Sequence, residues 1–266
     1  MYIVRDTLGT SSSGINHYPA TPLCSVVWSL AGATAMAGSA GNPHAQKFEP
    51  GTAVFNGPQQ QPWSTSSLGP AHFIIALFYP DAVHALTGLD MSAWVGKSVP
   101  ASSLLGMPWQ TLTAALIECT SDADRAALIN IFLEERWEKV SDIADRPHGL
   151  LADWIGPLSG LALSSSVAGS KRMAERRIKA AAGLSLRTMK RMSRAEQALM
   201  TARAELDAGK ISWSDVAADT GYADQSHMTR DTRALTGLSP GALAHMVEHD
   251  DSYWLYNIWS HAIQSS

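Results

Sequence analysis

Residues 216–240 read VAADTGYADQSHMTRDTRALTGLSP, and this stretch decides how the second half of the chain folds. Its first part contains small residues such as Ala217, which allow two helices to pack closely. Gly221 follows, and glycine readily adopts the positive φ that a tight turn between helices needs. Polar side chains then open a second helix, whose other side carries Met228 and Leu235. The pattern predicts a helix-turn-helix unit, and a single α-helix fits the width of a DNA major groove.

The same stretch resembles the signature of AraC/XylS-type regulators, G-[FY]-x-[DS]-Q-S-H-F-x-R-x-F-[KR]-x-x-x-G-x-[ST]-P. Residues 221–240 follow this pattern except at Met228 and Thr232, where the family usually has Phe. Methionine can fill the space of an aromatic ring because it is flexible and apolar. Thr232 is smaller, so we expect it to seat the second helix less firmly.

A second, more diverged resemblance lies upstream. Residues 170–178, SKRMAERRI, are similar to the family's S-x-R-x-L-x-R-x-F, with Ala174 and Ile178 in place of Leu and Phe. Residues 183–186, GLSL, are similar to the following G-x-S-P. The resemblance implies two recognition helices held about one DNA turn apart by a linker helix, so that one chain reads two successive major grooves.

The family resemblance also implies which side chains meet DNA. Arginine pairs with guanine, glutamine with adenine, and glutamate with a cytosine amino group, whereas phosphate contacts add affinity without sequence information. An ordinary exposed charge is the alternative at each position. The expected base contacts are Arg172, Glu175 and Arg176 in the first unit, and Gln225, Ser226, His227 and Arg230 in the second. The expected phosphate contacts are Lys171, Lys179, Arg187, Lys190 and Arg191.

The charge distribution agrees with a polyanionic partner. The chain has a net charge of −4, yet residues 169–247 carry 13 Lys and Arg against 8 Asp and Glu. Within residues 169–194, nine basic residues face a single acid, Glu175. A concentrated basic segment in an acidic protein favours nucleic acid as a ligand, although a solvated basic helix face is the other interpretation.

The first half of the chain has a different pattern. Short apolar runs at residues 25–30, 52–56 and 71–79 are bounded by Gly, Pro, Asn and Ser, which is typical of strands and turns. Residues 31–41 predict a loop or a poorly packed strand. A helix is predicted from Met107, and Ser121 with Asp124 forms the capping start of another that continues to Lys139. Residues 55–59, 78–80 and 86–89 weakly resemble the cupin-like sensor domains of some family members.

We therefore expect an α+β protein with three parts. A β-rich sensor domain with two following helices spans residues 1–146, a DNA-binding domain of seven helices spans residues 149–248, and an acidic, aromatic tail spans residues 249–266. The seven helices include two separate ones at residues 150–158 and 160–166, and the boundary falls at Arg146–Gly149.

The sequence gives little support for an enzyme, a metal site or a cofactor. Two cysteines make neither a zinc cluster nor a disulfide framework, and the N-terminal histidines are scattered. Residues 245–249 match the letters of an H-x-x-E-H zinc motif, and residues 237–241 match G-x-S-x-G, but neither lies in a suitable structural context. A cupin-type enzyme, the third reading, would require a bound metal.

We expect a cytoplasmic protein with no signal peptide and no membrane segment. The expected partners are double-stranded DNA and a second copy of the chain; a small-molecule effector and RNA polymerase are left open. A sensing or protein-interaction module with a decayed DNA-binding face is the rival function. The dimer is expected through Leu112, Leu116, Ile117, Leu128, Ile131 and Phe132, unless these complete the core of the monomer. The tail aromatics Tyr253, Trp254, Tyr256 and Trp259 should pack on the protein or on a second subunit.

Overall fold

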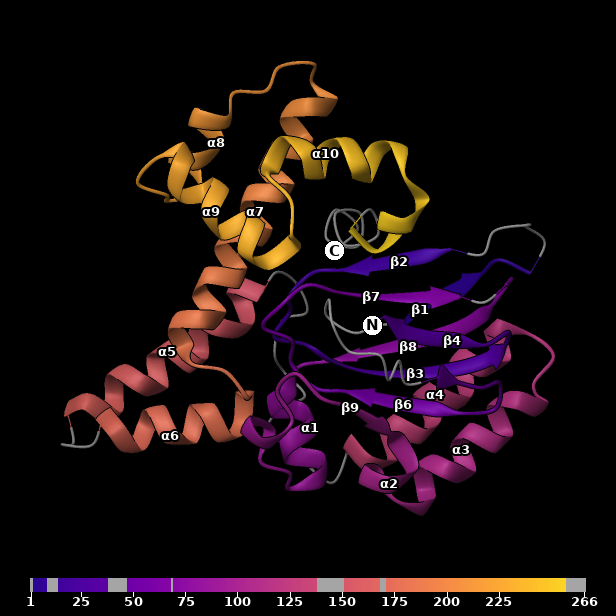
Figure 1. The fold of residues 1–266 in the computed structure, drawn as a ribbon. Coiled ribbons are helices and arrows are strands. Elements are labelled where there is room, and N and C mark those ends of the chain that lie inside the picture. The colour runs from indigo at the N-terminus through magenta and orange to yellow at the C-terminus, as the bar shows by residue number, and fades with distance from the viewer. Residues whose placement is uncertain are drawn as a thin grey trace.

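The computed structural model describes residues 2–8, 14–37, 47–67, 69–137, 151–167 and 171–256. Two antiparallel sheets with flanking helices form the N-terminal half, and helices form the C-terminal half (Figure 1). The expected α+β class is confirmed. No helix within the described ranges is long and apolar enough to cross a membrane. Several predictions lie outside the described residues: the Arg146–Gly149 boundary, the helix end at Lys139, Ser170 of the first unit, the side chain of Lys171, and Trp259 of the tail.

The three predicted apolar runs all form strands, and these strands build most of the first sheet. Its order is β1 (Tyr2–Asp6), β8 (His72–Phe78), β3 (Cys24–Ala31), β6 (Ala53–Asn56) and β9 (Ser98–Pro100). The second sheet has the order β2 (Ile15–Tyr18), β7 (Trp63–Ser67), β4 (Thr34–Ala37) and β5 (Lys47–Phe48). All neighbouring strands are antiparallel.

Side chains of the first sheet alternate between two environments, because successive residues of a strand point to opposite faces. On β3, Val26 and Trp28 pack in the core shared with the helices, whereas Val27 lines a cavity between the sheets. The indole of Trp28 donates a hydrogen bond to Thr113 Oγ1 at 3.1 Å and stacks on Trp109. One face of the sheet is therefore fixed to helices, and the other faces the second sheet.

The helices of this half are α1 (Pro80–Thr87), the 3-10 turn η1 (Met91–Ala93), α2 (Ala101–Leu105), α3 (Met107–Glu118) and α4 (Asp122–Trp137). The starts of α3 and α4 agree with the predictions. Ser121 Oγ accepts a hydrogen bond from the Asp124 amide at 3.1 Å and donates one to its carboxylate at 2.6 Å. Neither α1 nor α2 was predicted from the sequence.

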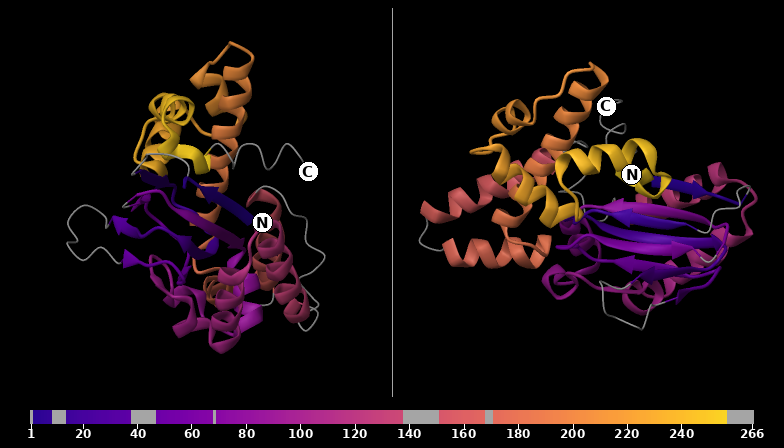
Figure 2. Two further views of the ribbon diagram at one scale, coloured as in Figure 1. Left: turned by 90° about the vertical axis from the view of Figure 1, so that its right-hand side faces the viewer. Right: turned by 45° about the horizontal axis from the view of Figure 1, so that its top comes forward.

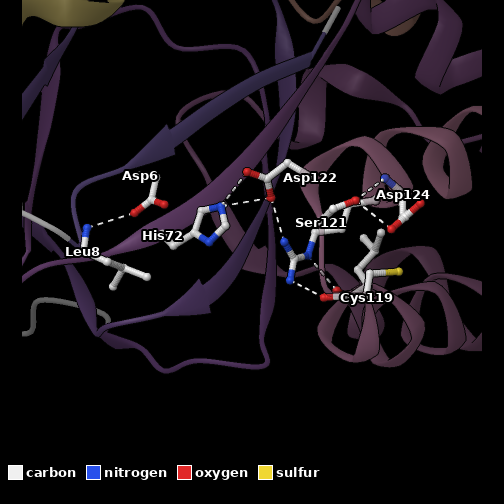
Figure 3. A network of polar contacts seen from close by, with 9 residues as sticks. Asp6, Leu8, His72, Cys119, Ser121, Asp122 and Asp124 are labelled. Atoms are coloured by element: carbon white, nitrogen blue, oxygen red, sulfur yellow. Dashed lines mark hydrogen bonds and ion pairs between the residues drawn. The ribbon is translucent and has the colours of Figure 1, made fainter.

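A polar network fastens α4 to the first sheet (Figure 3). His72 Nε2 on β8 lies 3.1 Å from a carboxylate oxygen of Asp122, at the start of α4. The same carboxylate accepts a hydrogen bond from Arg125 at 2.7 Å. Arg125 also donates to the carbonyl oxygens of Leu116 and Cys119, so one buried guanidinium joins the end of α3 to α4.

Ile131 and Phe132, both expected at a dimer contact, lie in different environments. Ile131 is 56% exposed, whereas Ile129 is fully buried. Two residues at 100° each place Ile131 about 200° around the helix from Ile129, on the solvent side. Ile117 on α3 is also exposed. The remaining residues expected at a dimer contact are Leu112, Leu116, Leu128 and Phe132, and they pack in the monomer's own core.

The C-terminal half contains α5 (Leu151–Val167), α6 (Lys171–Ala182), α7 (Leu186–Asp207), α8 (Trp213–Asp219), α9 (Gln225–Thr236), α10 (Pro240–His249) and the 3-10 turn η3 (Asp251–Tyr253). The two separate helices expected at residues 150–158 and 160–166 are instead one helix, α5, so the described residues hold six α-helices here. Pro157 lies inside α5 and removes one backbone hydrogen bond. Trp154, Ile155 and Leu158 are buried together around it, and this packing keeps the helix continuous.

The two halves share a core. Trp154 Nε1 of α5 donates a hydrogen bond to Asp81 Oδ1 of α1 at 2.9 Å, and its ring stacks on Tyr79 at 5.2 Å. At the end of α6, Gly183 has φ +77°, and a Cβ there would lie 2.9 Å from Pro58 Cγ. Only glycine therefore fits this junction. The end of α6 is packed against the N-terminal half.

The segment after α10 folds back onto the sheets, near β2 in both views of Figure 2. We call residues 250–256 the C-terminal tail. Trp254 is 4% exposed and donates a hydrogen bond to Asn16 Oδ1 at 2.7 Å. Tyr253 stacks on His17 at 4.5 Å, and Asp251 pairs with Arg5. The described tail aromatics pack on the protein itself, as one of the two alternatives predicted.

Candidate nucleic-acid interface

The second helix-turn-helix is built from local signals. Ser212 Oγ accepts the Asp215 amide hydrogen at 3.4 Å and caps α8. Asp224 Oδ1 accepts the amide hydrogen of His227 at 2.6 Å and caps α9. Gly221, in the turn between the two helices, has φ +74°. The predicted turn at Gly221 and the predicted helix that opens after it are confirmed.

One side of α9 is buried and the other is free. Met228, Thr232 and Leu235 recur at helical spacing and are all less than 9% exposed. Thr232 is covered although it is smaller than the Phe usual in the family. The exposed side begins at the first turn of the helix and carries the polar residues Gln225, Ser226, Arg230 and Arg233.

Arg191 and His227, two of the predicted contact residues, lie close to the carboxylate of Asp231. Arg191 Nε on α7 lies 3.3 Å from Asp231 Oδ1, and the Asp231 side chain is 13% exposed. His227 Nε2 lies 3.8 Å from the other oxygen of Asp231 and packs edge-on against Tyr222. The contact of Arg191 joins α7 to α9, whereas the contacts of His227 lie within α9 and the turn before it. Arg191 and His227 are therefore less free to reach DNA than Gln225 or Arg230.

Arg194 is a residue whose structural role the sequence analysis did not assign. Its guanidinium lies 4.7 Å from the centre of the Tyr222 ring and donates a hydrogen bond to the Gly221 carbonyl oxygen at 3.3 Å. Burial, together with the nearby Asp231 carboxylate, raises the pKa of Tyr222 to about 12, so the phenol stays neutral. Arg194 of α7 thus stabilises the turn between α8 and α9.

The first unit presents its charges in the same way. Ala174, Ile178 and Ala182 form the buried side of α6. The opposite side is exposed and carries Arg172, Glu175, Arg176 and Lys179. Arg187 and Lys190 are exposed in the first turns of α7, whose start is capped by Ser185 Oγ. Apart from Lys171, whose side chain is not described, every predicted contact residue of this unit is at the surface or close to it.

The linker helix α7 separates the two units. Its 22 residues span about 33 Å at 1.5 Å per residue, close to one turn of DNA. The end of α6 packs near the beginning of α7, through Leu184 and Met189, while α8 and α9 pack farther along it, around Ala198 and Ala202. Figures 1 and 2 place α6 and α9 beside different stretches of α7.

Comparison with protein families identifies this helical region. Residues 163–246 match the family model of a helix-turn-helix domain. They are a helix-turn-helix domain of the AraC type. This AraC-type domain runs from the second half of α5 into α10 and includes both candidate recognition helices. It indicates a DNA-binding transcription regulator.

The sequence matches no curated protein. Among solved structures, the chain is similar to ToxT from Vibrio cholerae, with 10% identity, a TM-score of 0.44, and coverage of 92% of this chain and 98% of that one. It is also similar to the AraC-like transcriptional activator CuxR, with 14% identity, a TM-score of 0.27, and coverage of 97% and 77%. Likenesses this distant carry no argument about function.

Metal-binding side chains do not gather in the described part of the chain. No group of three or more His, Cys, Asp or Glu residues there could hold a metal ion. Cys24 and Cys119 are both free thiols. His245 and His249, from the H-x-x-E-H letters, lie on the exposed side of α10.

Proposed function

We propose that this protein is a sequence-specific regulator of transcription that reads DNA with α6 and α9. The observation that carries the proposal is the row of exposed polar side chains Gln225, Ser226 and Arg230 on a capped and well-seated α9, within an AraC-type domain. Arginine and glutamine offer the paired donors and acceptors that distinguish base edges in the major groove.

For the first unit, we assign base contacts to Arg172, Glu175 and Arg176, which share the exposed side of α6. Exposed Lys179, Arg187 and Lys190 are assigned to phosphates. Arg191 is paired with Asp231, so its main contribution is to position α9. A phosphate contact of Arg191 would have to compete with that ion pair.

We also propose that the β-rich half senses a small molecule and in this way controls DNA binding. A cavity of about 80 Å³ lies between the two sheets. The two halves share a core through Trp154, Tyr79 and Leu235, so a change in the sheets can reach the helices. Coupling of this kind requires the effector to bind two arrangements of the protein with different affinity.

The proposal is tested by selecting preferred sites from randomised duplexes with the whole protein. Gln225→Ala and Arg230→Ala should each cost about 1–3 kcal/mol at one position of the site and relax the choice of base there. Arg233→Ala is the matched control, because it removes an exposed charge from the end of the same helix. It should weaken all duplexes about equally and leave the consensus unchanged.

Two results would count against the proposal. If Gln225→Ala and Arg230→Ala keep the consensus of the unaltered protein, α9 is not the reading helix. If the unaltered protein binds no duplex even at low salt, the DNA-binding face has decayed, and a sensing or protein-interaction module is the better description.

A further inference from the structure

The cavity between the two sheets has an unusual lining. Side chains of both sheets form it, among them Val27 and Ile75 from the first and Tyr18 and Trp63 from the second. One lining residue, Leu255, comes from the C-terminal tail, which follows the AraC-type domain in the sequence. A molecule in this cavity would therefore touch the sensor half and the segment after α10 at the same time.

The chemistry of the lining defines what fits. None of the described residues that line the cavity is Asp, Glu, Lys, Arg or His. Burial raises the pKa of Tyr18 to about 12, so its phenol adds no charge either. A charged ligand would lose its hydration without gaining a partner of opposite charge, which is costly. The cavity is thus suited to an uncharged molecule.

Among the buried polar side-chain atoms of the lining, the indole nitrogen of Trp63 lacks a hydrogen-bond partner in the described part of the chain. Nε1 of Trp63 is buried and makes no hydrogen bond to any described residue. A buried donor without an acceptor is unfavourable, and a ligand oxygen can satisfy it. By contrast, Asn56 already donates to Ser25 and accepts from Ser98. The indole nitrogen is a donor, so we expect it to favour a ligand that carries an acceptor.

The size of the cavity limits the ligand to a compact molecule. A cavity needs a volume of roughly 10–15 Å³ to hold a single water. The volume of about 80 Å³ corresponds to several waters, or to a small organic molecule of about one ring.

The C-terminal tail, which forms one wall of the cavity, is packed firmly on the sheets and also contacts the DNA-binding half. Trp254, next to Leu255, is buried among the sheets and hydrogen-bonded to Asn16. Tyr256, on the other side of Leu255, lines a second cavity of about 70 Å³ between α7, α9 and α10. Pro19 lines both cavities, and the amide of the next residue, Ala20, donates to the Leu235 carbonyl oxygen of α9 at 2.8 Å.

We propose that the cavity between the sheets binds a compact, uncharged, largely apolar molecule with one hydrogen-bond acceptor, and that Leu255 of the tail is part of this binding site. The proposal rests on the sensing role assigned above and specifies the class of effector and the contact through which it reaches α9. Its failure would leave the DNA-reading role of α9 intact, because ligand binding is measured without DNA.

The experiment uses the whole protein and three compounds of similar size. Acetophenone is neutral and carries an acceptor, ethylbenzene is neutral and lacks one, and benzoate is an anion. Calorimetry and saturation-transfer NMR measure their affinities. Acetophenone should bind about 2- to 10-fold more tightly than ethylbenzene, as expected for one net hydrogen bond, and at least about 10-fold more tightly than benzoate. Trp63→Phe should abolish the preference for acetophenone over ethylbenzene.

The role of the tail is tested with Leu255→Ala, which enlarges the cavity. It should shift the preference from acetophenone towards its longer homologue butyrophenone by about 5-fold or more. Leu206→Ala, which shortens an exposed leucine of α7, should leave that preference unchanged. Leu255→Trp should reduce acetophenone binding at least about 10-fold by filling the space. Circular dichroism checks that each variant is folded, and the alanine variant answers the question if the tryptophan variant is not.

The proposal is overturned if none of the neutral compounds binds the unaltered protein, or if benzoate binds as tightly as acetophenone. It is also overturned if neither Leu255 variant changes the order of affinities while the protein stays folded, because Leu255 would then not contact the ligand.

Discussion

The hydrogen bond between Trp154 and Asp81 should be a measurable link between the two halves of the protein. Both side chains are buried, at 2% and 6% exposed, and the indole nitrogen lies 2.9 Å from the carboxylate oxygen. A hydrogen bond to a charged acceptor contributes about 1.5–3 kcal/mol. Trp154→Phe also leaves some space unfilled, for about 1 kcal/mol more. We therefore expect this substitution to lower the free energy of unfolding by about 2–4 kcal/mol.

The assay is urea unfolding followed by far-UV circular dichroism, because changing a tryptophan alters the fluorescence directly. The cycle of Trp154→Phe, Asp81→Ala and the double variant isolates the interaction, and we expect a coupling of about 1–3 kcal/mol. Trp137→Phe, at the half-buried end of α4, is the control and should cost within about 1 kcal/mol. A coupling below about 0.5 kcal/mol would refute the reasoning, since the two side chains would then act independently.

Three further predictions concern DNA, assembly and pH. DNA affinity should fall roughly 10³-fold or more between about 50 and 200 mM salt if about six phosphates are contacted, as measured by fluorescence anisotropy; a salt-independent affinity would contradict the basic interface. Light scattering should give twice the 28.5 kDa chain mass, and Ile131→Glu should yield a folded monomer because Ile131 is 56% exposed; a surviving dimer would remove α4 from the contact. Burial, partly opposed by Asp250, lowers the pKa of His17 in the folded protein. As the pH falls below about 6.5, the unfolded chain protonates His17 before the folded protein does, so the free energy of unfolding should decrease. Urea unfolding should show a smaller decrease in the free energy of unfolding at low pH for His17→Phe than for the unaltered protein. If both proteins show the same dependence on pH, His17 does not cause the decrease.

The parts of the structure that were predictable from the sequence are encoded locally. On α9, the cap at Asp224, the closing Gly237 and the buried spacing of Met228, Thr232 and Leu235 all lie within fourteen consecutive residues. The starts of α4, α8 and α10 are likewise marked by a serine that caps the helix. The exposed positions of the candidate DNA contacts follow from the same periodicity.

The features that were missed depend on contacts between distant residues. Pro157 is a helix breaker, and the packing that overrides it comes from α6 and α7. Likewise, the hydrogen bond from Trp254 to Asn16 joins residues 238 positions apart. The helical spacing of Leu128, Ile131 and Phe132 likewise does not reveal that Ile131 is exposed while the other two pack in the core. Tertiary packing decided each of these cases, and local propensity could not show it.

The position of Trp254 has a consequence for how the protein is made. Trp254 completes the apolar cluster that contains Ile3, Phe73 and Ile75. A ribosome adds about 5–20 residues per second, so roughly 10–35 s separate the synthesis of β8 from that of Trp254. During this interval the two sheets are already present, but their apolar cluster lacks its last member. The nascent chain is then a natural client for a chaperone that binds apolar surface, until Trp254 has been made and covers that surface.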